Sequence, residues 1–253
     1  MAYKNYIFDL YGTLVDIHTN ERKSYLWEKT ALYMRFQGAD YTAQSLKRAY
    51  YEGIREQRRE KRGVFTEKMG RIILEEEIEV SFEELIPELY LKAGVTVTEE
   101  QAKDWAALFR ALSIQHLALY EGAKELLIRL KEDGKKVFLL TNAQRLFTEP
   151  ELSILGIRDC FDAVYYSSDE GFVKPSAYFY RKLLEEQCLD PQESVMVGND
   201  DLADAWGAHN CGMDSIYLYT KQSPKPAGAL PENCRRVSQI GDVDKNPLRR
   251  TSW

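Results

Sequence analysis

The strongest constraint on the fold is a regular alternation of short apolar runs with amphipathic segments in the second half of the chain. The apolar runs lie at residues 137–140, 161–166, 194–197 and 215–219. Parallel strands need long crossover connections, which are usually helices, so this alternation is typical of a parallel sheet. We therefore predict an α/β fold, a doubly wound and mainly parallel sheet with helices on both faces.

The segments between these runs have helical patterns. Residues 121–133 place Leu126, Leu127 and Leu130 on one face and stop at Gly134, a typical helix end. Further helices are expected around Leu152, at 176–188 and at 202–210. Three prolines between residues 224 and 231 end the regular pattern, and residues 234–243 are expected to add a last short strand.

The first strand, residues 3–9, is separated from the others by about a hundred residues of different character. This segment is rich in Glu, Arg, Lys, Tyr and Leu and has apolar residues at helical intervals. Thr98 followed by Gln101 is typical of a helix start. We predict that residues 1–15 and 117–243 form the α/β core, that 16–116 form a helical cap domain, and that 244–253 form a flexible tail.

Composition limits the partners of the protein. The chain has 253 residues, 44% hydrophobic residues, a net charge of -6 and a pI of about 5.3. This acidic balance disfavours general binding to nucleic acid or to an anionic membrane. The four cysteines are scattered, and there is neither a signal-peptide pattern nor an apolar run of membrane-spanning length. We expect a cytoplasmic protein, and no feature of the sequence indicates its oligomeric state.

Polar residues follow several of the predicted strands directly. Asp9 follows Tyr6-Ile7-Phe8, Thr141 and Asn142 follow Phe138-Leu139-Leu140, and the acid-rich stretch 199–204 follows Val195-Met196-Val197-Gly198. Ligands of open α/β sheets bind at the carboxyl ends of the strands. These side chains are therefore expected to meet at one edge of the sheet.

The acid-rich stretch contains Asn199, Asp200, Asp201 and Asp204. One interpretation is helix capping, because Asn and Asp are favoured at helix starts. The other is a cation site, because Mg²⁺ prefers oxygen ligands and often binds one or two carboxylates together with water. Three acids and an amide within six residues favour the cation.

These three stretches, together with Val173-Lys174-Pro175, resemble in order and character the motifs of the haloacid dehalogenase superfamily. The resemblance covers the first dozen residues and about 119–220. Most members of that superfamily are magnesium-dependent phosphatases. The resemblance implies hydrolysis of a small phosphorylated metabolite through an aspartyl-phosphate, with Mg²⁺ as the cofactor.

The same resemblance implies a role for each residue. Asp9 is the nucleophile, and Lys174 neutralises the charges of the phosphate and of Asp9. The metal is held by the Asp9 carboxylate, the Tyr11 backbone carbonyl and Asp200. Asn199, Asp201 and Asp204 surround it without direct bonds, and Asp204 also holds Lys174. The substrate phosphate is bound by Tyr11, Gly12, Thr141 and Asn142.

One position departs from the phosphatase pattern. The superfamily phosphatases usually carry a second aspartate two residues after the nucleophile, and here that residue is Tyr11. A phenol, with an ordinary pKa of about 10, is a poor replacement for a carboxyl group as an acid near neutral pH. Proton donation typically contributes about 10²–10⁴-fold to the rate. We expect slow hydrolysis of ordinary esters, a substrate with a good leaving group, or donation by Tyr11 or His18.

Two other functions remain open. Asp9-x-Tyr11 also resembles the 2-haloacid dehalogenase branch, in which the aspartate attacks carbon without a metal, and Tyr180 and Trp27 add to this similarity. Where that branch has an arginine this chain has Glu28, which would repel a halide, and the three acids favour a metal. The third possibility is a weakly active or non-catalytic regulatory member, and the retained nucleophile disfavours a non-catalytic role.

The predicted cap contains a dense run of charges at residues 55–62, with five Lys or Arg and two Glu. It is interpreted either as a basic rim that attracts an anionic substrate or as a solvated helix face whose charges compensate each other. The second interpretation is favoured for so mixed a run.

Overall fold

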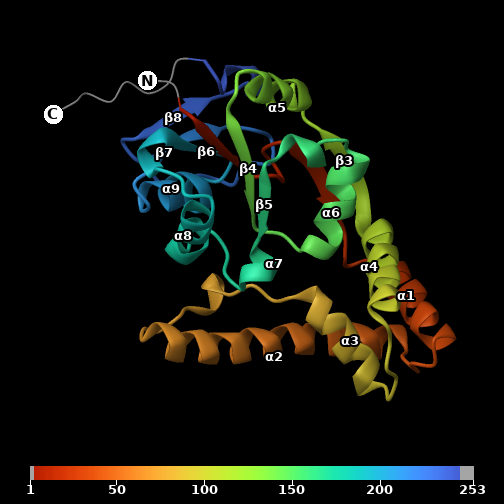
Figure 1. Ribbon diagram of the computed structural model, residues 1–253. Coiled ribbons are helices and arrows are strands. Elements are labelled where there is room, and N and C mark those ends of the chain that lie inside the picture. Colours follow the sequence, from red (N-terminus) through yellow and green to blue (C-terminus); the bar gives the residue numbers. More distant parts are fainter. Residues whose placement is uncertain (1–2, 246–253) are drawn as a thin grey trace.

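The computed structural model describes residues 3–245, and its centre is a six-stranded sheet in the order β5-β4-β1-β6-β7-β8 (Figure 1). Every neighbouring pair in this sheet is parallel, which confirms the predicted fold class. The strands are β1 (Asn5–Phe8), β4 (Lys136–Thr141), β5 (Ala163–Tyr166), β6 (Ser194–Gly198), β7 (Asp214–Leu218) and β8 (Cys234–Val237).

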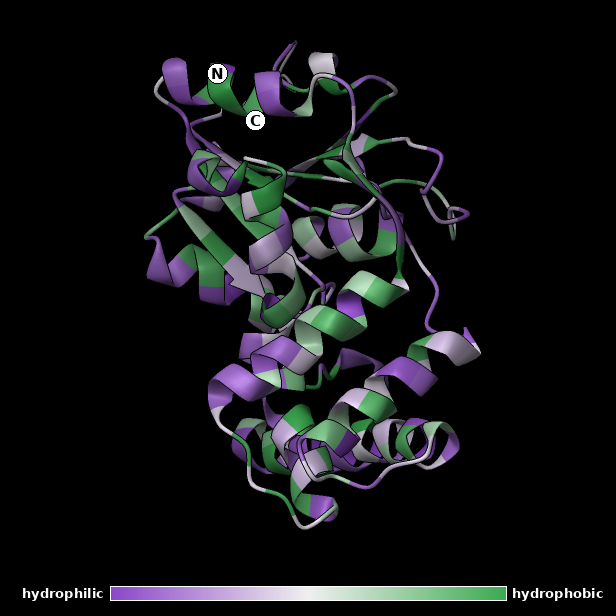
Figure 2. Ribbon diagram, turned by 90° about the vertical axis from the view of Figure 1, so that its right-hand side faces the viewer, coloured by the Kyte–Doolittle hydropathy of each residue, from purple (hydrophilic) through white to green (hydrophobic). Residues whose placement is uncertain are grey.

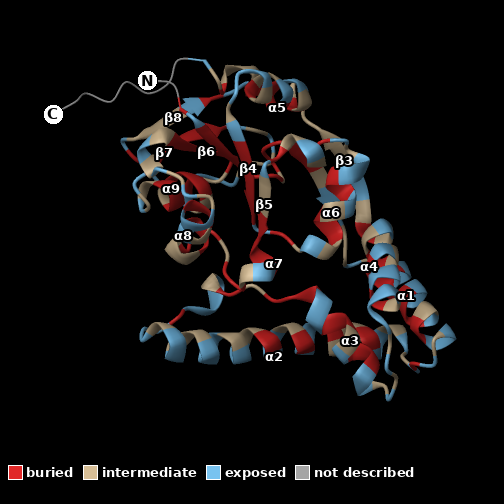
Figure 3. Ribbon diagram, in the orientation of Figure 1, coloured by how far each residue is buried: buried red, intermediate tan, exposed pale blue. Residues whose placement is uncertain are grey.

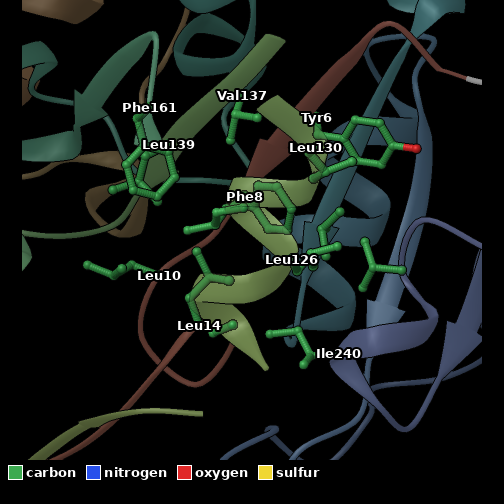
Figure 4. Packing of buried hydrophobic residues seen from close by; sticks show 14 of the residues in the cluster. Tyr6, Phe8, Leu10, Leu14, Leu126, Leu130, Val137, Leu139, Phe161 and Ile240 are labelled. Carbon is green, nitrogen blue, oxygen red and sulfur yellow. The ribbon is translucent and has the colours of Figure 1, made fainter. Parts of the chain in front are cut away.

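Helices cover both faces of the sheet because successive side chains of each strand point to opposite sides. Tyr6 and Phe8 pack with Leu126 and Leu130 of one helix (Figure 4), while Ile7 belongs to the cluster on the other face. Figure 2 shows hydrophobic residues concentrated in the strands, whereas the helices mix hydrophobic and hydrophilic positions. The helices of this part are α5 (Ala123–Glu132), α6 (Arg145–Ile154), α7 (Ser167–Glu170), α8 (Ala177–Glu186) and α9 (Gly207–His209).

Several short helical turns complete this part of the chain. The helix expected at 202–210 starts as a π-helical turn, η4 (Asp201–Trp206), which continues into α9. Only Cys234–Val237 of the predicted strand 234–243 is a strand, and its end is a 3₁₀ turn. The 3₁₀ turns are η1 (Glu75–Glu77), η2 (Arg158–Cys160), η3 (Pro191–Glu193) and η5 (Ile240–Asp242).

The long segment between β1 and β4 forms a helical layer beside the sheet (Figure 1). Its helices share a hydrophobic cluster that includes Trp27, Tyr50, Trp105 and Phe109. Figure 3 shows that the far end of the long helix α2 is mostly exposed. The helices are α1 (Ser24–Phe36), α2 (Ala43–Met69), α3 (Phe82–Lys92) and α4 (Glu99–Ser113).

The sequence analysis missed a two-stranded antiparallel ribbon at both ends of this helical segment. β2 (Val15–Thr19) pairs with β3 (Ile114–Leu119), with His18 opposite His116. Both strands are partly exposed and carry polar residues, so neither shows a buried apolar run. The proposed domain boundaries at residues 15/16 and 116/117 fall inside this ribbon.

Most of the predicted tail, residues 244–253, lies outside the described residues. Asp244 is described and accepts a hydrogen bond from Arg129 Nε at 2.7 Å. No helix among residues 3–245 is long and apolar enough to cross a membrane.

Candidate active site

Asp9 is held at the carboxyl end of β1 by a tight turn. Its backbone N–H donates to the Val197 carbonyl at 2.9 Å, and the residue is 8% exposed. Thr13 donates to Asp9 Oδ2 at 3.0 Å. The turn needs Gly12, which has φ of 83° and whose Cβ, if present, would lie 2.3 Å from Asn199 Nδ2. A glycine here therefore brings the turn against the loop that follows β6.

Lys174 joins the two sides of the site. Its buried Nζ lies 2.7 Å from Asp9 Oδ1 and 2.7 Å from Asp204 Oδ1. Burial alone would lower the pKa of Lys174, but the charges of Asp204 and Asp9 outweigh it and raise this pKa. Burial raises the pKa of Asp204, and Lys174 opposes that shift. The arrangement places one ammonium between two carboxylates.

Thr141 and Asn142 stand at the end of β4, beside β1. Thr141 is buried, and the side chain of Asn142 contacts the backbone of Lys174. Its Oδ1 accepts from the Lys174 backbone N–H at 2.7 Å, and its Nδ2 donates to the Lys174 carbonyl at 3.1 Å. Asn142 thus positions the backbone of Lys174.

The acid-rich stretch combines capping with a concentration of charge. Asp200 Oδ1 caps η4 by accepting from Leu202 and Ala203 backbone N–H groups at 2.9 and 2.8 Å. Asp201 is buried, and its carboxylate accepts from a backbone N–H in the loop after β7. Asn199 Oδ1 accepts from Thr13 at 3.3 Å. Helix capping therefore explains the position of Asp200. It does not explain Asn199, Asp201 and Asp204, which have other contacts.

The donor set suits Mg²⁺. Within residues 3–245 no three His, Cys, Asp or Glu side chains are close enough to hold a metal by themselves. Mg²⁺ does not require such a group, because one or two carboxylates usually suffice and water and substrate oxygens supply the rest. The two negative charges of Asp9 and Asp204 exceed the single positive charge of Lys174. Asp200 adds another carboxylate at the same edge of the sheet. This excess of negative charge favours a cation.

The side chain of Tyr11 is engaged with α6. Its hydroxyl lies 2.5 Å from Glu151 Oε2 and 2.9 Å from Thr148 Oγ1, and Arg110 Nη2 is 3.4 Å away. Burial, followed by the charge of Glu151, raises the pKa of Tyr11 above its ordinary value. Tyr11 is therefore a weaker acid than a free phenol, and its predicted role as a proton donor or side-chain phosphate ligand is not supported.

Arg110 and Glu151, which the sequence analysis missed, form an ion pair between α4 and α6. Arg110 Nε lies 2.5 Å from Glu151 Oε1, and the side chains are only 15% and 4% exposed. The guanidinium also lies 5.1 Å from the centre of the Phe147 ring. The sequence around Arg110 and Glu151 does not distinguish them from ordinary charged residues on a helix surface. Their pairing depends on how α4 packs against α6.

The remaining candidates have other contacts. His18 lies on β2, where Nε2 is 3.3 Å from Asp16 Oδ1. Glu28 is exposed on α1, so its charge gives no argument against a halide site. Tyr180 is buried and donates to the Ala203 carbonyl at 2.6 Å, which supports η4.

Comparison with known proteins agrees with this geometry. A family model described as haloacid dehalogenase-like hydrolase matches residues 3–212. A glyceraldehyde 3-phosphate phosphatase from Methanothermobacter thermautotrophicus is 31% identical over 119 residues, which are 47% of this chain and 53% of that protein. The chain thus spans about half the length of this curated relative.

Solved structures support the fold. A 2-haloacid dehalogenase from Pseudomonas syringae is similar over 95% of this chain and 96% of its own, with a TM-score of 0.60 and 17% identity. A haloacid dehalogenase-like hydrolase from Bacillus subtilis, solved with bound magnesium, covers 96% of this chain and 97% of its own, with a TM-score of 0.53 and 17% identity. Identities this low indicate the fold alone.

Proposed function

Because this chain belongs to the haloacid dehalogenase-like hydrolases, we propose that it is a Mg²⁺-dependent phosphatase of a small phosphorylated metabolite. The observation that carries the proposal is Lys174 Nζ at 2.7 Å from both Asp9 and Asp204, beside the acid-rich turn after β6. The phosphatase name of the matched archaeal relative supports the same reaction class.

The proposed reaction has two displacement steps. An Asp9 carboxylate oxygen attacks phosphorus, the bond from phosphorus to the leaving-group oxygen breaks, and the leaving alkoxide takes a proton from water to become the alcohol. A water molecule then attacks phosphorus and gives up a proton to solvent, and the bond from phosphorus to the Asp9 oxygen breaks, which releases phosphate and restores the Asp9 carboxylate. Lys174 offsets the repulsion between the carboxylate and the phosphate in the first step.

Asp9, Asp200 and the Tyr11 carbonyl would hold Mg²⁺, which when bound supplies further neutralisation of the phosphate charge. The backbone N–H groups of the turn after β4 would orient the phosphate oxygens. Asp9 and Lys174 are buried, so entry of a substrate requires the helical layer to move. Closure would then exclude water from the site. All four cysteines are free, which supports a cytoplasmic location.

The presence of Tyr11 in place of an aspartate predicts that the rate of hydrolysis depends on the leaving group of the substrate. The residue two positions after Asp9 is a phenol whose hydroxyl is hydrogen-bonded to the Glu151 carboxylate, so it is not a strong acid. We expect aryl phosphates, whose leaving groups need little protonation, to react faster than alkyl phosphates.

The deciding assay measures phosphate release from aryl and alkyl phosphates with Mg²⁺ and with EDTA. Release that requires Mg²⁺ and falls to background in Asp9→Asn supports the phosphatase. A parallel sample measures halide release from 2-chloropropionate, because the Asp-x-Tyr pattern at Asp9 and Tyr11 keeps the dehalogenase as the second candidate. Halide release that EDTA does not affect would refute the phosphatase proposal in favour of a dehalogenase. No detectable phosphate or halide in either assay would favour a non-catalytic role.

A further inference from the structure

The segment between α2 and α3 contacts both loops that carry the predicted site. On one side, Glu79 N–H donates to the Gly171 carbonyl at 2.9 Å, and Val173 N–H donates to the Glu77 carbonyl at 3.0 Å. These bonds pair the segment with the residues that lead directly into Lys174. Figure 1 shows the same segment close to α7, at the end of β5.

On the other side, the segment contacts the turn after β4. Gln144 Nε2 donates to the Val80 carbonyl at 2.9 Å, and Gln144 Oε1 accepts from Phe82 N–H at 3.0 Å. The segment is thus hydrogen-bonded to the turn after Thr141 as well as to the residues just before Lys174. This part of the inserted layer is therefore connected to the predicted phosphate site from two sides.

Glu79 is a half-buried charge of this segment. Its Oε2 accepts from Ser167 Oγ at 2.9 Å, and the same Oγ accepts from the Ala143 backbone N–H at 2.9 Å. Burial raises the pKa of Glu79. Ala143 lies in the turn predicted to hold the phosphate, so the hydroxyl group of Ser167 links the Glu79 carboxylate to that turn.

A pocket of about 400 Å³ opens beside Glu79. It is lined by Arg58, Glu75, Glu76, Ile78, Glu79 and Val173. Val173 immediately precedes Lys174, so one wall of the pocket belongs to the loop that carries this lysine. The buried Nε of Arg58 has no hydrogen-bond partner within residues 3–245, which leaves a donor on the pocket's own lining unsatisfied.

We propose that this pocket binds the organic part of the substrate and selects a small phosphorylated polyol or sugar, with Glu79 and Arg58 as its specificity residues. Three carboxylates accept hydrogen bonds from hydroxyl groups and repel a substrate carboxylate or a second phosphate. The guanidinium of Arg58 donates to a hydroxyl oxygen. A site that pairs with hydroxyl groups discriminates strongly against analogues that lack them, because its polar groups are then left unpaired. This inference rests on the phosphatase function proposed above.

The test compares three substrates that differ only beyond the phosphate: glycerol 3-phosphate, propyl phosphate and phenyl phosphate. We expect wild-type kcat/KM to be at least about tenfold higher for glycerol 3-phosphate than for propyl phosphate. Glu79→Gln and Arg58→Met should each remove most of this preference, measured as the ratio of the two kcat/KM values, while circular dichroism stays native. The matched control is Glu60→Gln, an exposed glutamate of α2 outside the pocket, which should change neither value.

The possible failures are distinguishable. If the wild type hydrolyses none of the three esters, the phosphatase proposal fails and this inference fails with it. If phenyl phosphate is hydrolysed but the glycerol and propyl esters are treated alike, only the inference is overturned. It is also overturned if both pocket variants keep the wild-type preference. Circular dichroism reports correct folding, and Arg58→Met decides the question if Glu79→Gln does not fold.

Discussion

Replacing Arg110 by methionine should strongly destabilise the protein, because it leaves a buried carboxylate without its counter-charge. The Glu151 side chain is 4% exposed and lies 2.5 Å from Arg110 Nε, so both charges are removed from water. Breaking a buried pair from one side costs about 3–5 kcal/mol. With an m value of about 2 kcal/mol/M, the urea midpoint should fall by about 1.5–2.5 M.

A double-mutant cycle tests the physical reason for this cost. Adding Glu151→Gln to Arg110→Met removes the unpaired charge, so the double variant should be more stable than Arg110→Met alone. The control is Lys103→Met on the same helix, which breaks the exposed pair with Glu99 and should leave the urea midpoint unchanged.

The reasoning is refuted if Arg110→Met unfolds within about 1 kcal/mol of the wild type, because that value is typical of a solvated surface pair. It is also refuted if the two substitutions at Arg110 and Glu151 are additive. Additivity would mean that the loss comes from packing against Phe147 rather than from the charge.

Three further outcomes follow from the site. Gly12→Ala should lower stability by about 1–3 kcal/mol in urea unfolding, and it should abolish phosphate release because its Cβ would displace Asn199; unchanged activity would contradict the proposed contact. Lys174→Met should reduce phosphate release to background while circular dichroism stays native, and retained turnover would exclude Lys174 from the reaction. Burial raises the pKa of Glu79 above its unfolded value, so its protonated form is favoured in the folded state and this stabilisation is lost as pH rises through the folded pKa. Glu79→Gln cannot ionise and should therefore gain stability relative to the wild type as pH rises above the ordinary glutamate pKa of about 4.5, whereas a constant difference in urea midpoint would contradict the desolvation of this charge.

The sequence predicted those parts of the site that depend on local pattern. Asp9, Thr141 and Asp200 each follow an apolar run, and parallel strands bring such positions to one edge of the sheet. The ribbon formed by β2 and β3 was not predicted, because its strands are half exposed and lack a clear alternation. Their pairing becomes visible only when residues about a hundred positions apart meet.

The sequence alone determined the parallel α/β fold and the residue types at the strand ends, because hydrophobic periodicity is a property of neighbouring residues. Only the tertiary structure decided what those side chains contact. Tyr11 meets Glu151 across 140 positions, and Lys174 meets Asp9 across 165. The same packing placed the side chain of Asn142 against the backbone of Lys174, and it placed Glu79 of the inserted segment against Ser167. Burial and distance set the strength of such contacts, and neither is defined until the helices and the sheet are packed together.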